Sequence, residues 1–188
     1  MHCVPDSLTE VLAAMLSRTG HIIVFAESCT AGLVAASLGR VAGVSEVLAG
    51  SAVVYQLATK SAWLQVPASL LENPGPVSQV VSEHMARGAL QITPHATMAA
   101  SVTGHLGPGA PAELDGVVWA TVAVRRDDRI DIQSRSFTLH PPKRLISAEA
   151  DGHLRVRHWR QVQAAQVVLE FCLQTLGGET LESAGGVS

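Results

Sequence analysis

The chain has 188 residues, of which 47% are apolar and 15% are charged, and its formal net charge is −3. This composition excludes intrinsic disorder, which requires low hydrophobicity and high net charge, and it predicts one domain over residues 1–177 with a flexible tail over 178–188. The sequence has no basic run to attract a nucleic acid, no apolar stretch of the roughly 18 residues that span a bilayer, and no signal peptide. Three cysteines without a CxxC pair are typical of free thiols in the cytoplasm.

Apolar segments of strand length alternate with amphipathic segments along the chain. The run at 21–25 is apolar almost throughout, which is typical of a strand buried on both faces. In chain order we expect a helix from residue 7, strands at 21–25 and 51–55, short helices at 58–64 and 67–72, a helix from Ser78, strands at 98–102, 117–124 and 129–139, and a last helix at 159–176. The pattern predicts a layered α/β fold with a mostly parallel sheet, which becomes mixed if the strand at 129–139 pairs antiparallel as an edge.

Two loops follow predicted strands, where sheets of this kind bind their ligands. The first, residues 27–32, runs into a helix whose N–H groups and dipole favour an anion, and Ser28 and Thr30 add hydroxyls. Its alternative interpretation is an ordinary turn with Thr30 as the N-cap. The second, residues 101–109, contains three glycines that let the backbone approach a ligand closely, and its alternative is a flexible surface loop.

A serine, a tyrosine and a lysine lie close together in the sequence between residues 43 and 60. Amide hydrolysis needs a nucleophile and a base, and a lysine serves as the base when burial lowers its pKa. Ser45 would be the nucleophile, Lys60 the base and Tyr55 a proton relay, provided that residues 45 and 60 share one cavity. The alternatives are a turn cap at Ser45, a core aromatic at Tyr55 and a solvated charge at Lys60.

Cys29 is the second candidate nucleophile, because a thiol near a helix start can have a lowered pKa, although a small buried hydrophobe is its alternative interpretation. The eight histidines form no HxH or HExxH pattern, so we expect neither a metal site nor a cofactor. His105 stands out among them because it lies between the glycines of the second loop.

Several segments, in order and at the right spacing, resemble one family: the C-terminal domain of competence/damage-inducible protein CinA, which also occurs alone as nicotinamide mononucleotide deamidase. The resemblance covers roughly residues 7–125, with a weaker match in the last helix, and the chain is similar to the stand-alone form. The matching segments are AESCTAG at 26–32, residues 43–60, PVS at 76–78, SVTG at 101–104 with GPG at 107–109, and GVVW at 116–119.

The resemblance implies an α/β/α sandwich, a homo-oligomer (a dimer or larger), and hydrolysis of the carboxamide of nicotinamide mononucleotide to give nicotinic acid mononucleotide and ammonia. It places Ser45 at the family's nucleophile, Lys60 at its base and Tyr55 between them, with no cofactor. Helix-start N–H groups would hold the phosphate, and N–H groups near the nucleophile would stabilise the oxyanion. The implied substrate-binding residues are Ser28, Thr30, Gly32, Thr103, Gly104, Gly107 and Gly109.

The chain also departs from the family pattern. Leu57 and Ala58 replace an Asn-Glu pair beside the expected base, and His105 stands where small or aliphatic residues are common. A longer segment at 139–157 replaces a short Gly-Asp-Arg link, so the substrate-contacting arginine is assigned to Arg155 by register, with Arg157 and Arg160 as rivals. Leu57 and Ala58 leave open a nucleotide-binding protein without turnover, and Cys29 separately leaves open a cysteine amidase.

Overall fold

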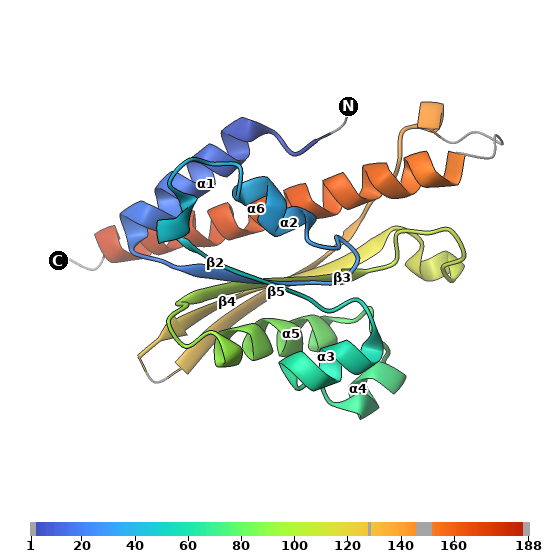
Figure 1. Ribbon diagram of the computed structural model, residues 1–188, viewed down its shortest axis with the longest axis horizontal. Coiled ribbons are helices and arrows are strands. Elements are labelled where there is room, and N and C mark those ends of the chain that lie inside the picture. Colours follow the sequence, from blue (N-terminus) through green and yellow to red (C-terminus); the bar gives the residue numbers. More distant parts are fainter. Residues whose placement is uncertain (1–2, 128, 146–151, 186–188) are drawn as a thin grey trace.

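The fold is built on one sheet of five strands, seen in a computed structural model that describes residues 3–127, 129–145 and 152–185 (Figure 1). The strand order is β2-β1-β3-β4-β5. The strands are β1 (Ile23–Glu27), β2 (Leu48–Val53), β3 (Met98–Gly104), β4 (Val117–Arg126) and β5 (Arg129–Thr138).

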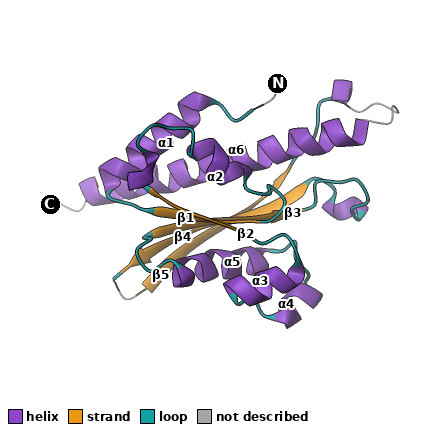
Figure 2. Ribbon diagram, viewed as in Figure 1, coloured by secondary structure: helices purple, strands orange, loops and turns teal. Residues whose placement is uncertain are grey.

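Helices cover both faces of the sheet, which confirms the three-layer α/β/α sandwich (Figure 2). One face carries α1 (Asp6–Thr19), α2 (Leu33–Leu38) and α6 (Gly152–Gly185). The other face carries α3 (Leu57–Leu64), α4 (Ala68–Glu72) and α5 (Gln79–Ile92). Short 3-10 turns complete the described chain: η1 (Val44–Glu46), η2 (Ala112–Leu114) and η3 (Lys143–Leu145). No helix among the described residues has both the length and the apolar character that crossing a bilayer requires.

Strand β1 lies inside the sheet, between β2 and β3, and it is buried along its whole length because its side chains supply two separate cores. Ile23 and Phe25 point into the core beneath α1, α2 and α6, whereas Val24 and Ala26 point into the core beneath α3 and α5. Side chains alternate between the two faces of a strand, so only a continuous apolar run can satisfy both layers. The apolar run in the sequence therefore correctly predicted an interior strand that is buried on both faces.

The sheet is mixed with an antiparallel edge strand, as expected, but only two of its four strand pairings are parallel. β1 runs parallel to β2 and to β3, but β4 is antiparallel to β3, and β5 is antiparallel to β4. A parallel connection requires a crossover, usually a helix, to return the chain to the other end of the sheet. The segment between β3 and β4 contains only the single turn η2, so the chain folds back at the same end of the sheet and β4 must run antiparallel.

The last helix is longer than the sequence indicated. α6 runs from Gly152 to Gly185, whereas the expected helix covered 159–176 and the expected tail began at 178. The glycine pair at 177 and 178 suggested a break, but the helix continues through both positions. Residues 146–151 of the expected segment at 139–157 lie outside the described residues.

Two helices on one face approach each other unusually closely. Gly88 of α5 packs against Leu64 of α3, and a Cβ atom at position 88 would lie 2.3 Å from the Leu64 carbonyl oxygen. No side chain fits in that space, so glycine at this position lets α3 lie directly against α5. This contact sets the height of α3 above the sheet, and α3 carries Lys60.

Candidate active site

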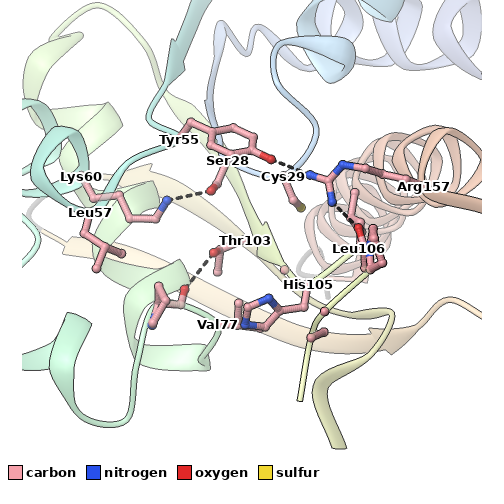
Figure 3. A pocket seen from close by; sticks show the side chains of 16 residues that line it. Ser28, Cys29, Tyr55, Leu57, Lys60, Val77, Thr103, His105, Leu106 and Arg157 are labelled. Carbon is pink, nitrogen blue, oxygen red and sulfur yellow. Dashed lines mark hydrogen bonds between the residues drawn. The ribbon is translucent and has the colours of Figure 1, made fainter. Parts of the chain in front are cut away.

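A cavity of about 260 Å³ opens at the carboxyl ends of β1, β2 and β3 (Figure 3). This is the edge at which ligands bind in sheets of this type. The lining residues come from the turn after β1, the segment after β2 with the start of α3, the segment before α5, and the end of β3 with the loop that follows it, and α6 adds one arginine. They are Ser28, Cys29, Tyr55, Leu57, Lys60, Pro76, Val77, Thr103, Gly104, His105, Leu106, Gly107, Pro108, Gly109, Ala110 and Arg157.

A serine and a lysine meet at the floor of this cavity. Lys60 Nζ lies 2.7 Å from Ser28 Oγ and 2.6 Å from the Val54 carbonyl oxygen, and it donates a hydrogen bond to each. The Lys60 side chain is only 1% exposed, and Ser28 is also buried. The backbone brings them together because Ser28 follows β1, Lys60 follows the neighbouring parallel strand β2, and Val54 N donates to the Glu27 carbonyl oxygen at 2.7 Å. We refer to these two residues as the Ser28–Lys60 pair.

Burial changes the protonation chemistry of the pair. Removing the Lys60 ammonium from water lowers the pKa of this amine from 10.5 to about 8. No carboxylate lies among the described residues that line the cavity, so the buried ammonium has no counter-ion there. A lysine with such a pKa is partly uncharged near neutral pH and can accept a proton.

The neighbouring thiol behaves in the opposite way. Burial raises the pKa of Cys29 to about 12, and the nearby Lys60 charge lowers it only in part. A thiol is a strong nucleophile only as the thiolate, and burial strongly disfavours that form here. The geometry therefore favours the hydroxyl of Ser28 over the sulfur of Cys29.

Ser45 does not lie near this pair. It lies in η1, before the amino end of β2, and its side chain is exposed. Lys60 follows the opposite end of β2, and six extended residues span roughly 20 Å. The expectation that residues 45 and 60 share a cavity is therefore wrong. The two residues are close in sequence, but strand β2 lies between them and holds them at its opposite ends. The hydroxyl beside Lys60 belongs to Ser28.

The start of α2 is also not the anion site that we expected. The buried carboxylate of Glu27 already occupies it and accepts from the N–H groups of Gly32 (2.9 Å), Val34 (3.1 Å) and Ala35 (3.0 Å). Thr30 Oγ1 also donates to Glu27, at 2.8 Å. Thr30 and Gly32 therefore hold the protein's own carboxylate and do not line the cavity.

Ser51 Oγ adds a further hydrogen bond to Glu27, at 3.0 Å, from β2. One carboxylate thus fixes β1, β2 and the turn that carries Ser28. The sequence analysis missed this role. The signal for it was an acidic residue at the end of an apolar strand that is buried on both faces, since such an acid must find partners.

The arginine at the cavity is Arg157, which the sequence analysis ranked as a rival of Arg155. Arg157 donates to the Tyr55 hydroxyl and to the Gly107 carbonyl oxygen, each at 2.5 Å, and so spans the cavity mouth (Figure 3). Arg155 is not among the described residues that line the cavity. Tyr55 does line it, but its hydroxyl pairs with Arg157.

The loop after β3 forms the opposite wall. Thr103, Gly104, Gly107 and Gly109, the four residues expected here, all line the cavity. Residues 104–109, which we call the glycine loop, are held from behind by Arg160. Its guanidinium forms two 2.7 Å contacts with the Asp115 carboxylate and donates to the Leu106 carbonyl oxygen at 3.2 Å. Asp115 has a lowered pKa because Arg160 donates to it. Arg160 therefore supports the wall from outside the cavity.

Comparison with known proteins agrees with this fold. The model of the CinA C-terminal domain family matches residues 5–150. A CinA-like protein of Mycobacterium sp. (strain JLS) is 41% identical over 141 residues, which cover 68% of this chain and 33% of that protein. A CinA-like protein of Mycobacterium tuberculosis (strain ATCC 25177 / H37Ra) is 39% identical over 158 residues, with coverage of 75% and 36%. The chain thus spans about a third of the length of these curated relatives.

Solved structures are similar over nearly the whole chain. The competence/damage inducible protein CihA from Agrobacterium tumefaciens gives a TM-score of 0.76 at 27% identity and covers 94% of this chain and 99% of its own. A CinA superfamily protein from Klebsiella pneumoniae 700603 gives a TM-score of 0.79 at 23% identity, with coverage of 92% and 98%, which supports the fold. Because the family model matches well over half of the sequence, the chain belongs to the CinA C-terminal domain family.

Proposed function

We propose that the chain is a metal-independent amidohydrolase that converts nicotinamide mononucleotide to nicotinic acid mononucleotide and ammonia. The observation that supports this most directly is the buried contact of 2.7 Å between Lys60 Nζ and Ser28 Oγ at the floor of a ligand-sized cavity. The nucleophile in this proposal is Ser28, not Ser45, because Ser28 is the hydroxyl within reach of the base.

In the proposed first step, uncharged Lys60 keeps its hydrogen bond to the Val54 carbonyl oxygen and accepts the Ser28 proton. Ser28 Oγ then forms a bond to the carboxamide carbon, and the carbonyl oxygen becomes an oxyanion. Backbone N–H groups near Ser28 are the proposed donors to this oxyanion. The resulting Lys60 ammonium carries the proton that the leaving nitrogen needs.

In the second step the tetrahedral intermediate collapses. The carbon–nitrogen bond breaks, Lys60 returns the proton to the nitrogen, and ammonia leaves behind an ester with Ser28. A water molecule then attacks the ester carbon, with Lys60 again as the base, and Ser28 regains its proton as the carboxylate product departs. Lys60 thus serves as base and acid in turn, which its pKa of about 8 permits.

The choice of substrate comes from the family resemblance, and the cavity charge supports it. Arg157 carries a positive charge at the cavity mouth, whereas none of the described lining residues is acidic. Such a cavity favours a ligand that bears a negative group, and the phosphate of a mononucleotide is one. We also expect a homo-oligomer, which light scattering on the purified chain would detect.

Three single variants test the proposed chemistry. Ser28→Ala and Lys60→Ala should each reduce ammonia release from nicotinamide mononucleotide by at least a thousandfold, because neither variant keeps both nucleophile and base. Ser45→Ala is the matched control, a serine exposed at the other end of β2, and it should keep wild-type turnover. Loss of turnover in Ser45→Ala, with Ser28→Ala still active, would return the nucleophile to position 45.

A second candidate function is nucleotide binding without turnover. The supporting observation is Leu57, an apolar residue that lines the cavity where the family usually has an asparagine. Its companion Ala58 is exposed and is not among the described lining residues, so only Leu57 alters the cavity wall. A rise in melting temperature with nicotinamide mononucleotide, without ammonia release over several hours, would favour this function over hydrolysis.

A further inference from the structure

The proposed function raises the question of where the substrate phosphate binds. If the carboxamide lies at the Ser28–Lys60 pair, the phosphate must reach another part of the cavity. The start of α2, a usual place for a phosphate, is filled by the Glu27 carboxylate. The phosphate partners must therefore come from a different wall.

The glycine loop presents a side chain that has no other use in the structure. His105 lines the cavity, and Figure 3 shows its imidazole beside Thr103 and Val77, across the cavity from Lys60. The ring forms no hydrogen bond with any residue in the described ranges. Its backbone is fixed, because His105 N donates to the Val117 carbonyl oxygen and Gly116 N donates to the His105 carbonyl oxygen, each at 2.9 Å. A rigid backbone thus holds an available donor at the cavity.

The surroundings of this ring suit an anion. Lys60 from α3 and Arg157 from α6 face the same cavity, and the described lining residues add no carboxylate. The backbone N–H groups of Gly107, Gly109 and Ala110 donate to nothing within the described part of the chain. Gly107 and Gly109 have positive φ angles of 65° and 83°, and turns of this kind often direct N–H groups toward a bound anion.

We propose that His105 is a specificity-determining residue that donates a hydrogen bond to the phosphate monoester of the substrate, together with the free N–H groups of the glycine loop. This inference rests on the proposed function for the position of the carboxamide. If His105 has this role, the chain should bind a nucleotide more tightly than the corresponding nucleoside, and the difference in affinity should depend on His105. The expected effect of removing the ring is about a tenfold loss in affinity for the nucleotide, the size typical of a hydrogen bond to a charged group.

The test is a binding experiment in the Ser28→Ala background, so that turnover does not consume the ligand. Isothermal titration calorimetry would compare nicotinamide mononucleotide with nicotinamide riboside, which differs only by lacking the phosphate. His105→Ala should weaken binding of the mononucleotide about tenfold and leave the riboside unchanged. His105→Gln, which retains a hydrogen-bond donor, should recover part of the loss. His153→Ala is the matched control, because His153 lines a separate cavity behind the glycine loop.

The possible results separate this inference from the proposed function. A mononucleotide that binds no more tightly than its riboside, or a His105→Ala variant that weakens both ligands equally, overturns the role of His105 even if the wild-type chain releases ammonia. A selective loss for the mononucleotide supports the role of His105 even if the wild-type chain releases none. In that case the proposed hydrolysis is wrong, whereas the proposed phosphate site is supported.

Discussion

Lys60 must lose a proton before it can accept one from Ser28, so ammonia release should depend on pH in a defined way. The perturbation is a change of pH on the unmodified chain, with nicotinamide mononucleotide well below saturation. Under these conditions the rate reports the ionisation of the free enzyme. Because the base acts in its uncharged form, the rate should rise with pH and then level off.

The size of the rise follows from the pKa of about 8 that burial gives to Lys60. With that value the uncharged fraction of Lys60 is about 1% at pH 6, about 9% at pH 7, about 50% at pH 8 and about 91% at pH 9. The rate should therefore rise about tenfold between pH 7 and pH 9. An unburied lysine, with its ordinary pKa of 10.5, would still be climbing steeply above pH 9.

The assay is initial-rate ammonia release from pH 6 to pH 10 in buffers of constant ionic strength. Lys60→Arg is the control, because it keeps a long cationic side chain that does not lose its proton, and it should be inactive throughout. A wild-type profile that is flat from pH 6.5 to pH 9, or that falls across this range, would show that the reasoning about Lys60 is wrong.

Three further predictions concern stability and the nucleophile. Lys60→Met should raise the free energy of unfolding at pH 7 by about 1 to 3 kcal/mol, since the folded-state pKa lies below the unfolded one and burying the charge destabilises the native state. In urea titrations the difference in free energy of unfolding between Lys60→Met and the unmodified chain should shrink as pH rises from 8 to 10.5. A difference that stays constant over this range would contradict the prediction. Cys29→Ala should retain turnover, because burial keeps this thiol protonated, and an inactive but folded variant would revive the cysteine amidase. Glu27→Ala should lower the free energy of unfolding by more than about 3 kcal/mol, because it leaves several buried donors unpaired. Glu27→Gln should lower the free energy of unfolding by less, because it keeps an acceptor oxygen. Equal urea midpoints for the two variants would contradict this prediction.

The sequence predicted the layers of the fold well because each layer leaves a local pattern. A run such as 21–25 can be satisfied only in the middle of a sheet that is covered on both faces. The direction of β4 was not visible in the same way. It depends on whether the preceding segment crosses the sheet, and a loop rich in glycine and proline does not reveal where it returns.

The candidate site was predicted in part. The glycine loop was found because it follows a strand, whereas Tyr55 and Lys60 were found because they lie close to a serine in the sequence and match the family pattern. The partner of Lys60 was missed because Ser45 is closer to it in sequence, whereas pairing of β1 with β2 decides which residues meet in space. The rule that residues after neighbouring parallel strands share one edge points to Ser28 and could have found it. The occupant of the α2 start was missed, although an acidic residue at the end of a fully buried strand indicates a carboxylate that needs buried hydrogen-bond donors.

The close packing of α5 against α3 at Gly88 has a consequence for the evolution of the chemistry. A single added methyl group there would meet the Leu64 carbonyl oxygen and force α3 outward, and the amine at residue 60 would move away from its hydroxyl partner. Under the proposed function, the reaction would therefore depend on a residue that does not line the cavity. A survey of random substitutions scored only by turnover would mark Gly88 as essential, although Gly88 contributes only the absence of a side chain where Leu64 packs.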